Sequence, residues 1–314
     1  MNMKKIVVLG GSGFVGAHVC ENLVRDGWHI TVLTRRRHHA RSVVHLPGLV
    51  VIECDVYNAH ALNRVVAGHD ALVNLVGILH GSQADFQRAH VGLAQRVAIA
   101  CTMGGVKRVV HVSALGVDEG QPDAAPSVYL RSKGEGEAVL IQAATGALSL
   151  TRDVFGLTVI RPSLIFGPED RSINLFAKAQ RIFPVILLAN SHARFQPVWV
   201  QDVAQAVVRS LAGASVASSP RVLEACGPDV FTLRELVRLS GAASGCESLV
   251  IDVPEWLGRL QTAVMQLAPG RPWLSLDAMD SMQRDSVATG QHPGLSSLGI
   301  LASALPSIAQ DYLG

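Results

Sequence analysis

Apolar positions follow two patterns that alternate along the chain, short continuous runs and longer stretches with helical spacing. The runs are rich in β-branched residues and lie near residues 4–9, 29–34, 49–54, 70–76, 107–112 and 157–161. Such runs are typical of strands buried on both faces of a parallel sheet. The stretches with helical spacing predict helices near residues 14–26, 58–67, 84–103 and 127–144. The alternation predicts an α/β fold with a doubly wound, Rossmann-type parallel sheet.

The first predicted strand ends in a glycine-rich stretch that opens the first helix, Gly10-Gly11-Ser12-Gly13-Phe14-Val15-Gly16. Glycines at this spacing let the backbone turn tightly, approach a pyrophosphate and pack the helix against the strand. The helix N-terminus adds free N–H groups and a partial positive charge. We predict a dinucleotide site formed by Gly10, Ser12, Gly13, Phe14, Val15 and Gly16; an ordinary tight turn is the alternative.

The alternation weakens after the sixth predicted strand, which suggests two lobes. We assign residues 1–165 to an NAD(P)-binding Rossmann domain, to which a helix over 199–212 returns. Residues 166–198 and 213–314 are predicted to form a smaller, mostly helical C-terminal lobe for substrate or partner. Such a lobe would cover the carboxyl ends of the strands, where ligands bind in open α/β sheets.

Composition narrows the class of protein. The 314 residues are 49% hydrophobic and 17% charged, which suggests a soluble, cytoplasmic protein with a large core. A net charge of +2 argues against a general nucleic-acid binder. The five cysteines are far apart without metal-like spacing, so we expect reduced core thiols and no metal site. Lys4-Lys5 precedes only four apolar residues, too few for a signal peptide.

The end of the second predicted strand bears on the choice of dinucleotide. It reads Thr34-Arg35-Arg36, with no carboxylate in the place that would bind the ribose 2′-hydroxyl of NAD. Guanidinium groups pair well with phosphate. We predict NADP, with Arg35 and Arg36 on the 2′-phosphate beside Thr34, and NAD as the alternative. Further contacts are expected from the ends of the third and fourth strands, at Asp55, Val56, Leu75, Val76 and Gly77.

Tyr129 and Lys133 are four residues apart in a predicted helix and so share one face. A cation near a phenol favours the phenolate and lowers the phenol pKa toward the useful range. We expect both side chains to contact the cofactor and to act in catalysis. The alternative is an ordinary amphipathic helix with a half-buried tyrosine and a solvated lysine.

Several of these motifs together resemble an extended or atypical short-chain dehydrogenase/reductase: the glycine-rich stretch, Asp55, the turn over 74–77, the Tyr129/Lys133 pair and the segment 161–168. A closer similarity is to the branch that contains the nucleotide-binding accessory subunit of respiratory complex I (NADH-ubiquinone oxidoreductase) and its bacterial homologues. It is carried by residues 74–79, 111–116, 129–137 and 195–204.

The resemblance implies NADP(H) held by the glycine-rich stretch, Arg35 and the Tyr129/Lys133 pair, with Tyr129 as general acid/base and Lys133 as its partner. A serine after the fifth strand would orient a carbonyl, and Ser113 stands there. Active extended enzymes usually carry further hydroxyl residues at this place, whereas here Ala114 and Leu115 follow. Val112 and Pro162, which end the fifth and sixth strands, complete the expected cofactor contacts.

Two functions stay open. The first is an NADP-dependent oxidoreductase acting on a small or quinone-like substrate. The second is a non-catalytic nucleotide-binding scaffold or assembly factor for a respiratory or quinone-synthesis complex; a sugar-nucleotide epimerase or dehydratase is a weaker third option. The amphipathic segment 255–267 is predicted to pack its apolar side in the smaller lobe, with peripheral membrane or quinone contact as the alternative.

Overall fold

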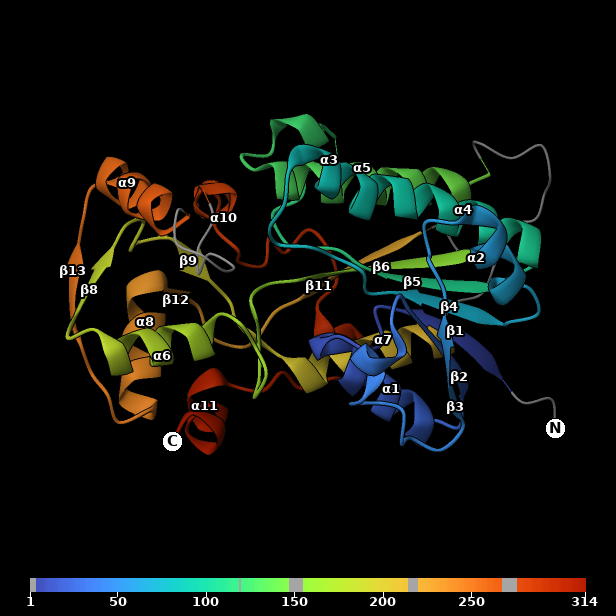
Figure 1. Ribbon diagram of the computed structural model, residues 1–314, viewed down its shortest axis with the longest axis horizontal. Coiled ribbons are helices and arrows are strands. Elements are labelled where there is room, and N and C mark those ends of the chain that lie inside the picture. Colours follow the sequence, from blue (N-terminus) through green and yellow to red (C-terminus); the bar gives the residue numbers. More distant parts are fainter. Residues whose placement is uncertain (1–3, 119, 147–154, 214–219, 267–275) are drawn as a thin grey trace.

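A seven-stranded parallel sheet forms the centre of the larger part of the molecule (Figure 1). The computed structural model describes residues 4–118, 120–146, 155–213, 220–266 and 276–314. In chain order the strands are β1 (Lys5–Leu9), β2 (His29–Thr34), β3 (Leu49–Glu53), β4 (Ala71–Asn74), β5 (Arg108–Val112), β6 (Gly156–Pro162) and β11 (Arg221–Ala225). Across the sheet they run β3-β2-β1-β4-β5-β6-β11. The predicted doubly wound Rossmann fold is confirmed.

Helices cover both faces of the sheet (Figure 1). One face carries α1 (Phe14–Arg25) and α7 (Val200–Gly213), which pack on each other. The other carries α2 (Ala59–Val66), α4 (Leu93–Gly104) and α5 (Val128–Ala144). Ile6 and Val8 of β1 belong to the core on the first face, and Val7 and Leu9 to the core on the second. Burial on both faces explains why this strand reads as one continuous apolar run.

A short connection leads into α4. It consists of α3 (Gln83–Phe86) and a π-helical turn η2 (Gln87–Gly92). Single π-turns within helices are uncommon and often mark functional sites. The 3-10 turn η1 (Arg37–Ala40) follows β2, and the 3-10 turn η3 (Pro122–Ala124) precedes α5.

Strand β11 corrects the predicted division of the chain. The sequence analysis placed all of 213–314 in the smaller lobe, but β11 pairs in parallel with β6 and completes the sheet. The strand was missed because a glutamate interrupts its short apolar run. Glu224 is nevertheless buried, because its carboxylate accepts hydrogen bonds from the Thr289 and Gly290 N–H groups and the Thr289 hydroxyl.

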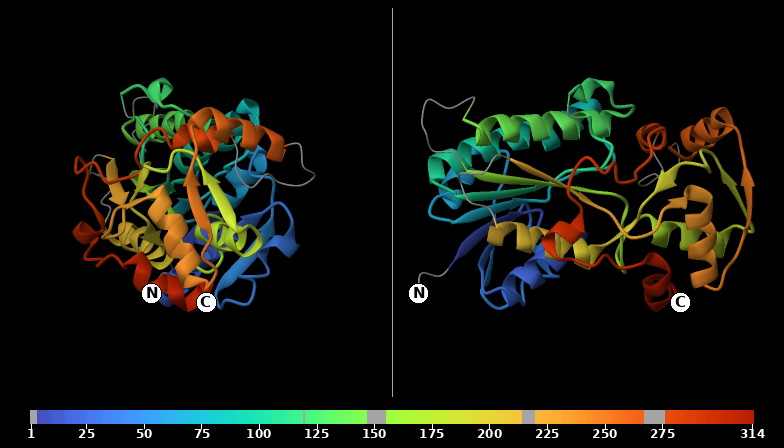
Figure 2. Two further views of the ribbon diagram at one scale, coloured as in Figure 1. Left: turned by 90° about the vertical axis from the view of Figure 1, so that its left-hand side faces the viewer. Right: turned by 180° about the vertical axis from the view of Figure 1, so that it is seen from behind.

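The smaller lobe lies beyond the carboxyl ends of the strands (Figures 1 and 2). Its helices are α6 (Ile173–Ile182), α8 (Leu233–Ala243), α9 (Glu255–Gln266), α10 (Leu276–Ser281) and α11 (Leu305–Leu313). The 3-10 turn η4 (Leu295–Leu298) precedes α11 and packs on α7. Short strands pair in three small sheets: β7 (Ile165–Phe166) with β10 (Val198–Trp199), β8 (Val185–Leu188) with β13 (Leu249–Asp252), and β9 (Arg194–Phe195) with β12 (Phe231–Thr232).

Helix α9 packs by a different face from the one predicted. Trp256 and Leu260 are 67% and 55% exposed, so they do not lie in the core of the lobe. The packed face instead holds Gly258, where a Cβ would come within 2.3 Å of the Ala189 side chain, and the buried Thr262. Small residues let the helix approach the lobe closely. Within the described residues, no helix has the length and apolar character that crossing a membrane requires.

Candidate functional site

The glycine-rich stretch forms the turn between β1 and α1. Gly10 has a φ of +79°, a conformation that favours glycine, and its carbonyl accepts a hydrogen bond from the Gly13 N–H at 3.0 Å. A Cβ on Gly16 would lie 2.2 Å from that same carbonyl oxygen. The N-cap residue of α1, Gly13, makes no side-chain cap hydrogen bond. The first N–H groups of α1 are therefore left to bind an anion, which fits a pyrophosphate.

The loop after β4 lies directly against this turn. A Cβ on Gly10 would meet the Leu75 carbonyl carbon at 3.0 Å and the Val76 nitrogen at 3.2 Å. The buried Asn74 shapes the loop, because its Oδ1 accepts the Val76 N–H and its Nδ2 donates to His111. The structure thus brings together the residues predicted from the ends of the first and fourth strands.

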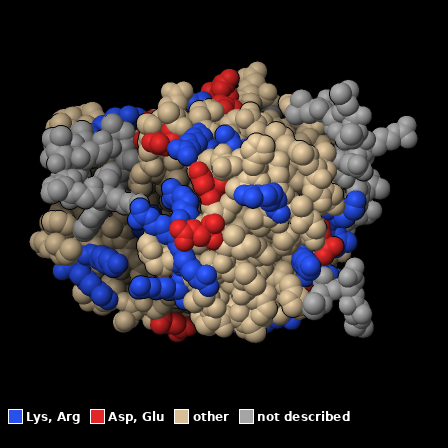
Figure 3. All heavy atoms as spheres, turned by 45° about the vertical axis from the view of Figure 1, so that its right-hand side comes forward, with Lys and Arg blue, Asp and Glu red and all other residues tan. Residues whose placement is uncertain are grey.

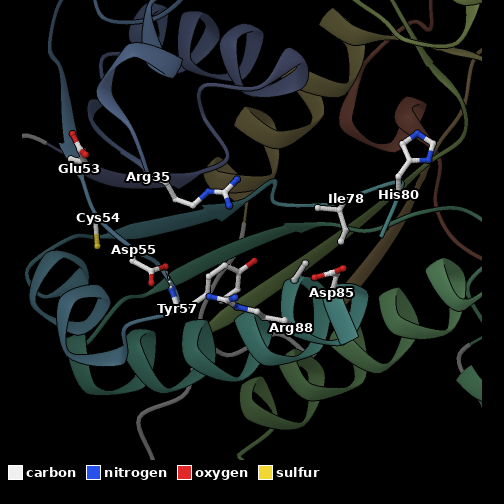
Figure 4. Close-up of a pocket in the computed structure, with 10 residues that line it drawn as sticks. Arg35, Glu53, Cys54, Asp55, Tyr57, Ile78, His80, Asp85 and Arg88 are labelled. Carbon is white, nitrogen blue, oxygen red and sulfur yellow. Dashed lines mark hydrogen bonds between the residues drawn. The ribbon is translucent and has the colours of Figure 1, made fainter. Parts of the chain in front are cut away.

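A cavity of about 600 Å³ opens beside the ends of β2 and β3 (Figure 4). Its lining residues are Arg35, Glu53, Cys54, Asp55, Tyr57, Ile78, His80, Asp85, Arg88 and Ala89. Two of them, Arg35 and Asp55, were predicted as cofactor contacts. In a space-filling view, Lys and Arg side chains gather around a hollow, with Asp and Glu beside them (Figure 3).

The other residues predicted at this end lie around the cavity rather than in its wall. Arg36 is exposed, and its carbonyl accepts a hydrogen bond from the buried Thr34 hydroxyl at 3.0 Å. Val56 packs in the core on the α2 face of the sheet. Asp55 Oδ1 accepts the Tyr57 N–H at 3.0 Å, so the carboxylate holds the turn before α2.

Arg88 was not predicted. It lies on η2, and its guanidinium carbon is 4.3 Å from the centroid of the Tyr57 ring. Arg88 and Arg35 each lower the Tyr57 pKa, although burial raises it more. The two residues of this contact are about thirty positions apart, and neither belongs to a motif, so no sequence signal pointed to them.

Lys133 is buried beneath the carboxyl end of β5. Its Nζ donates a hydrogen bond to the Val112 carbonyl at 2.8 Å. Burial lowers the Lys133 pKa to about 8, opposed by the nearby Glu137 carboxylate. The predicted residues Val112 and Lys133 are therefore in direct contact, and the lysine is not the solvated side chain of an ordinary amphipathic helix.

The expected lowering of the Tyr129 pKa is wrong. Burial, and then the charge of Asp277, raise the Tyr129 pKa to about 12. Asp277 comes from α10 and accepts the Val128 and Tyr129 N–H groups at 2.7 and 3.2 Å. The sequence pattern shows the lysine one turn away, whereas the charged group that most affects this phenol comes from a distant segment.

His90 connects the loop after β4 to the helix that carries Tyr129. Its Nε2 accepts the Ile78 N–H at 3.2 Å, so we assign the ring proton to Nδ1, which lies 2.8 Å from the Ser132 hydroxyl. The Ser132 hydroxyl in turn donates to the Tyr129 carbonyl at 2.9 Å. Burial, and then the Lys133 charge, lower the His90 pKa to about 3. The imidazole is neutral and positions both segments.

Ser113 lies at the same strand end as the lysine contact. Its side chain is buried, and its hydroxyl has no hydrogen-bond partner among the described residues. The next predicted contact along the edge, Pro162, uses its carbonyl to accept the Leu115 N–H at 2.9 Å. A buried hydroxyl without a partner is costly, and a polar ligand would relieve that cost. Across the described residues, no three His, Cys, Asp or Glu side chains are grouped as a metal site requires.

Comparison with known proteins places the chain in a family. Residues 6–226 match the model of the NAD dependent epimerase/dehydratase family. The chain belongs to this family. The match confirms the resemblance to extended short-chain dehydrogenase/reductases and makes a nicotinamide dinucleotide the expected cofactor.

Similar proteins of known name support the resemblance to the complex I subunit. The chain is 28% identical over 309 residues to NADH dehydrogenase [ubiquinone] 1 alpha subcomplex subunit 9, mitochondrial, of Rattus norvegicus, covering 95% of this chain and 76% of that protein. It is 27% identical to the ceramide reductase of Caulobacter vibrioides, covering 80% of this chain and 74% of that protein. The predicted similarity to a complex I subunit is confirmed, and other similar proteins are named as reductases.

Solved structures support the fold of the family. DesIV (dTDP-glucose 4,6-dehydratase) from Streptomyces venezuelae, with NAD and TYD bound, aligns with a TM-score of 0.73 at 22% identity, covering 98% of this chain and 96% of that one. MoeE5 in complex with UDP-glucose and NAD aligns with a TM-score of 0.71 at 19% identity, covering 98% of this chain and 97% of that one.

Proposed function

We propose that the protein binds NADP(H) and reduces a small or quinone-like carbonyl substrate, using Tyr129, Lys133 and Ser113. The observation that carries this proposal is the strand end at Val112 and Ser113. There Lys133 is anchored at 2.8 Å, beside a buried hydroxyl with no described partner. The reductase names among the relatives support a reduction, since the Caulobacter vibrioides protein matches over 80% of this chain.

The nucleotide would lie along the carboxyl edge of the sheet. The glycine-rich stretch would hold the pyrophosphate through the N–H groups of α1, and Arg35 would bind the 2′-phosphate. Leu75, Val76 and Gly77 would contact the nucleotide through the loop that touches Gly10. When bound, reduced NADP supplies a hydride to the carbonyl carbon.

The side chains would handle the proton. With a pKa near 12, Tyr129 keeps its proton at neutral pH, so it would act as an acid and donate that proton to the developing alkoxide oxygen. Lys133, with a pKa of about 8, is mostly protonated at neutral pH and would stabilise the phenolate that remains. The Ser113 hydroxyl would donate a hydrogen bond to the same substrate oxygen.

Stopped-flow absorbance of reduced NADP tests this proposal with a panel of ketones and quinones. We expect substrate-dependent oxidation by the wild-type protein and a rate about a hundredfold or more lower for Tyr129→Phe. Tyr312→Phe is the matched control, because Tyr312 lies in α11 and donates to Asp170, away from this edge. The proposal fails if the wild-type protein oxidises reduced NADP with none of the substrates.

A second candidate is a nucleotide-holding scaffold in a respiratory or quinone-synthesis complex. The similarity to the complex I subunit extends over 95% of the chain and favours it. The smaller lobe also leaves large apolar side chains exposed on β8, β13 and α9: Val185, Leu187, Leu249, Ile251, Trp256 and Leu260. For this role we propose a cytoplasmic protein at the membrane periphery, whose apolar side chains contact the complex.

Affinity capture distinguishes the scaffold from the reductase. The tagged protein, isolated from solubilised membranes with and without NADPH, is expected to retain respiratory or quinone-pathway proteins and to copurify with nucleotide that it does not turn over. Capture without such proteins counts against the scaffold. The sugar-nucleotide option has weaker support: the family name includes epimerases and dehydratases, but the two solved structures compared above are at most 22% identical and share only the fold.

A further inference from the structure

The cavity beside β2 and β3 receives two guanidinium groups from its two sides (Figure 4). Arg35 extends from the end of β2, and Arg88 from the π-helical turn η2. Within the described part of the chain, neither guanidinium makes a hydrogen bond or an ion pair. Glu53, Asp55 and Asp85 line the same cavity. Because neither guanidinium is bound to one of these carboxylates, both are left to bind an anion between them.

The local charge balance near Tyr57 supports the same conclusion. Arg88, Arg35 and Arg96 each lower the Tyr57 pKa, and Asp55 alone among nearby charges raises it. The two other acidic residues of this corner, Asp85 and Glu53, differ in their contacts. Asp85 accepts hydrogen bonds from the N–H and hydroxyl of Ser82 at 2.9 and 2.8 Å and so caps α3. These hydrogen bonds, and to a smaller extent the Arg88 charge, lower the Asp85 pKa. Glu53 ends β3 and is exposed.

Tyr57 holds Arg88 in place. The guanidinium lies 4.3 Å from the ring centroid, which orients the long side chain before any ligand arrives. Arg96, about two helical turns further on, donates from Nε to the Tyr57 carbonyl at 3.0 Å and fixes the tyrosine backbone. Preorganisation of this kind reduces the entropy that a flexible arginine loses on binding.

We propose that Arg88 is a second ligand of the adenosine 2′-phosphate, facing Arg35 across the cavity, and that Tyr57 positions it. This inference rests on the NADP(H) binding proposed above. Two guanidiniums can each donate paired hydrogen bonds to one phosphate. NAD carries a hydroxyl in that place and would offer neither guanidinium a phosphate, so Arg88 contributes to the choice of NADP.

Calorimetric titration with NADP⁺, NAD⁺, adenosine 2′,5′-bisphosphate and AMP tests the role of Arg88. For Arg88→Met, we expect the affinity for NADP⁺ and for the bisphosphate to fall about tenfold or more, with NAD⁺ and AMP unchanged. Tyr57→Leu should show a smaller loss of affinity for the same two ligands. Tyr57→Phe should keep the wild-type affinity, because the ring and not the hydroxyl orients Arg88. Arg238→Met, an exposed arginine of α8, is the matched control.

The outcomes separate the two proposals. If the wild-type protein binds neither dinucleotide, or prefers NAD⁺, the proposed NADP(H) function itself fails. If the wild-type protein prefers NADP⁺ and Arg88→Met keeps that preference, only the role of Arg88 is overturned. A loss of equal size for NADP⁺ and NAD⁺ also overturns it, since that pattern reports general damage to the cavity.

Discussion

His90 is a single side chain whose burial makes the stability of the protein sensitive to acid. Its folded pKa of about 3 lies below the ordinary histidine value of 6.5. As the pH falls below 6.5, the unfolded chain takes up a proton at this position and the folded protein does not. The contribution of His90 to stability is therefore present above pH 6.5 and is lost as the pH falls toward 3.

We predict that His90→Gln reduces this acid sensitivity. Between about pH 5.5 and about pH 4, the free energy of unfolding of the variant should fall less steeply than that of the wild type, by about 1.4 kcal/mol per pH unit. Urea unfolding at a series of pH values measures the slope. His38→Gln, at an exposed histidine, should keep the wild-type slope. Equal slopes for His90→Gln and the wild type would contradict the neutral, buried assignment.

Gly16 is the glycine whose replacement the turn tolerates least. A Cβ there would lie 2.2 Å from the Gly10 carbonyl oxygen and 2.6 Å from the Gly11 Cα, both backbone atoms that cannot rotate away. We predict that Gly16→Ala lowers the free energy of unfolding by about 1–3 kcal/mol. The affinity for dinucleotide should also fall, because the turn must move.

Two measurements follow both effects of Gly16→Ala, denaturant unfolding and the fluorescence of bound NADPH. Gly104→Ala is the control, since a Cβ at that helix end meets its nearest atoms at an ordinary 3.4 Å. Wild-type nucleotide affinity in Gly16→Ala would show that this turn does not hold the dinucleotide.

Helix α5 and strand β6 are joined by a buried ion pair. Glu137 and Arg161 are 2% and 5% exposed, and the Arg161 Nη2 lies 2.5 Å from Glu137 Oε2. The same carboxylate is near Lys133, whose pKa it raises against the effect of burial. The pair therefore sets both the position of the helix that carries Tyr129 and Lys133 and the charge around the lysine.

We predict that Glu137→Gln costs about 3–5 kcal/mol in the free energy of unfolding, because it leaves a buried guanidinium without its counter-charge. Arg161→Met and the double variant Glu137→Gln/Arg161→Met complete the set. The double variant should cost less than the two single changes added together, since it removes both charges. Urea unfolding of the four proteins measures this as a double-mutant cycle. Additive costs in the cycle would mean that the two side chains do not stabilise each other.

At the scale of the whole molecule, the candidate site lies where the carboxyl ends of the strands meet residues 277–286. Asp277 caps α5, Arg284 donates to the Gly116 carbonyl at 3.1 Å, and the Ser286 carbonyl accepts from the Ser163 hydroxyl at 2.6 Å. These contacts tie residues after 276 to the strand ends that would hold the nucleotide. Binding at the edge should therefore stabilise both lobes together.

We predict that NADPH raises the stability of the entire chain in one transition. At about a hundredfold excess over its Kd, NADPH should add about 2.7 kcal/mol to the free energy of unfolding. Thermal unfolding followed by circular dichroism, with rising NADPH, measures the increase in Tm. NADH at the same concentration is the comparison and should raise Tm less. A Tm that does not change at saturating NADPH would contradict the nucleotide site.

Much of the larger lobe could be predicted from the sequence alone: six of its strands, the turn at Gly10 and Gly16, and the family to which these motifs point. These features depend on short-range rules, since an apolar run or a glycine conformation is set by neighbouring residues. The place of Arg35 in the cavity wall could also be expected, because this residue directly follows a predicted strand.

Only the tertiary structure decided the rest. It placed β11 in the sheet, brought Arg88 onto Tyr57, and buried His90. It also raised the Tyr129 pKa, with the help of a carboxylate 148 residues away in the chain. Burial and electrostatic interactions depend on distance in space, and spacing along the chain does not report that distance.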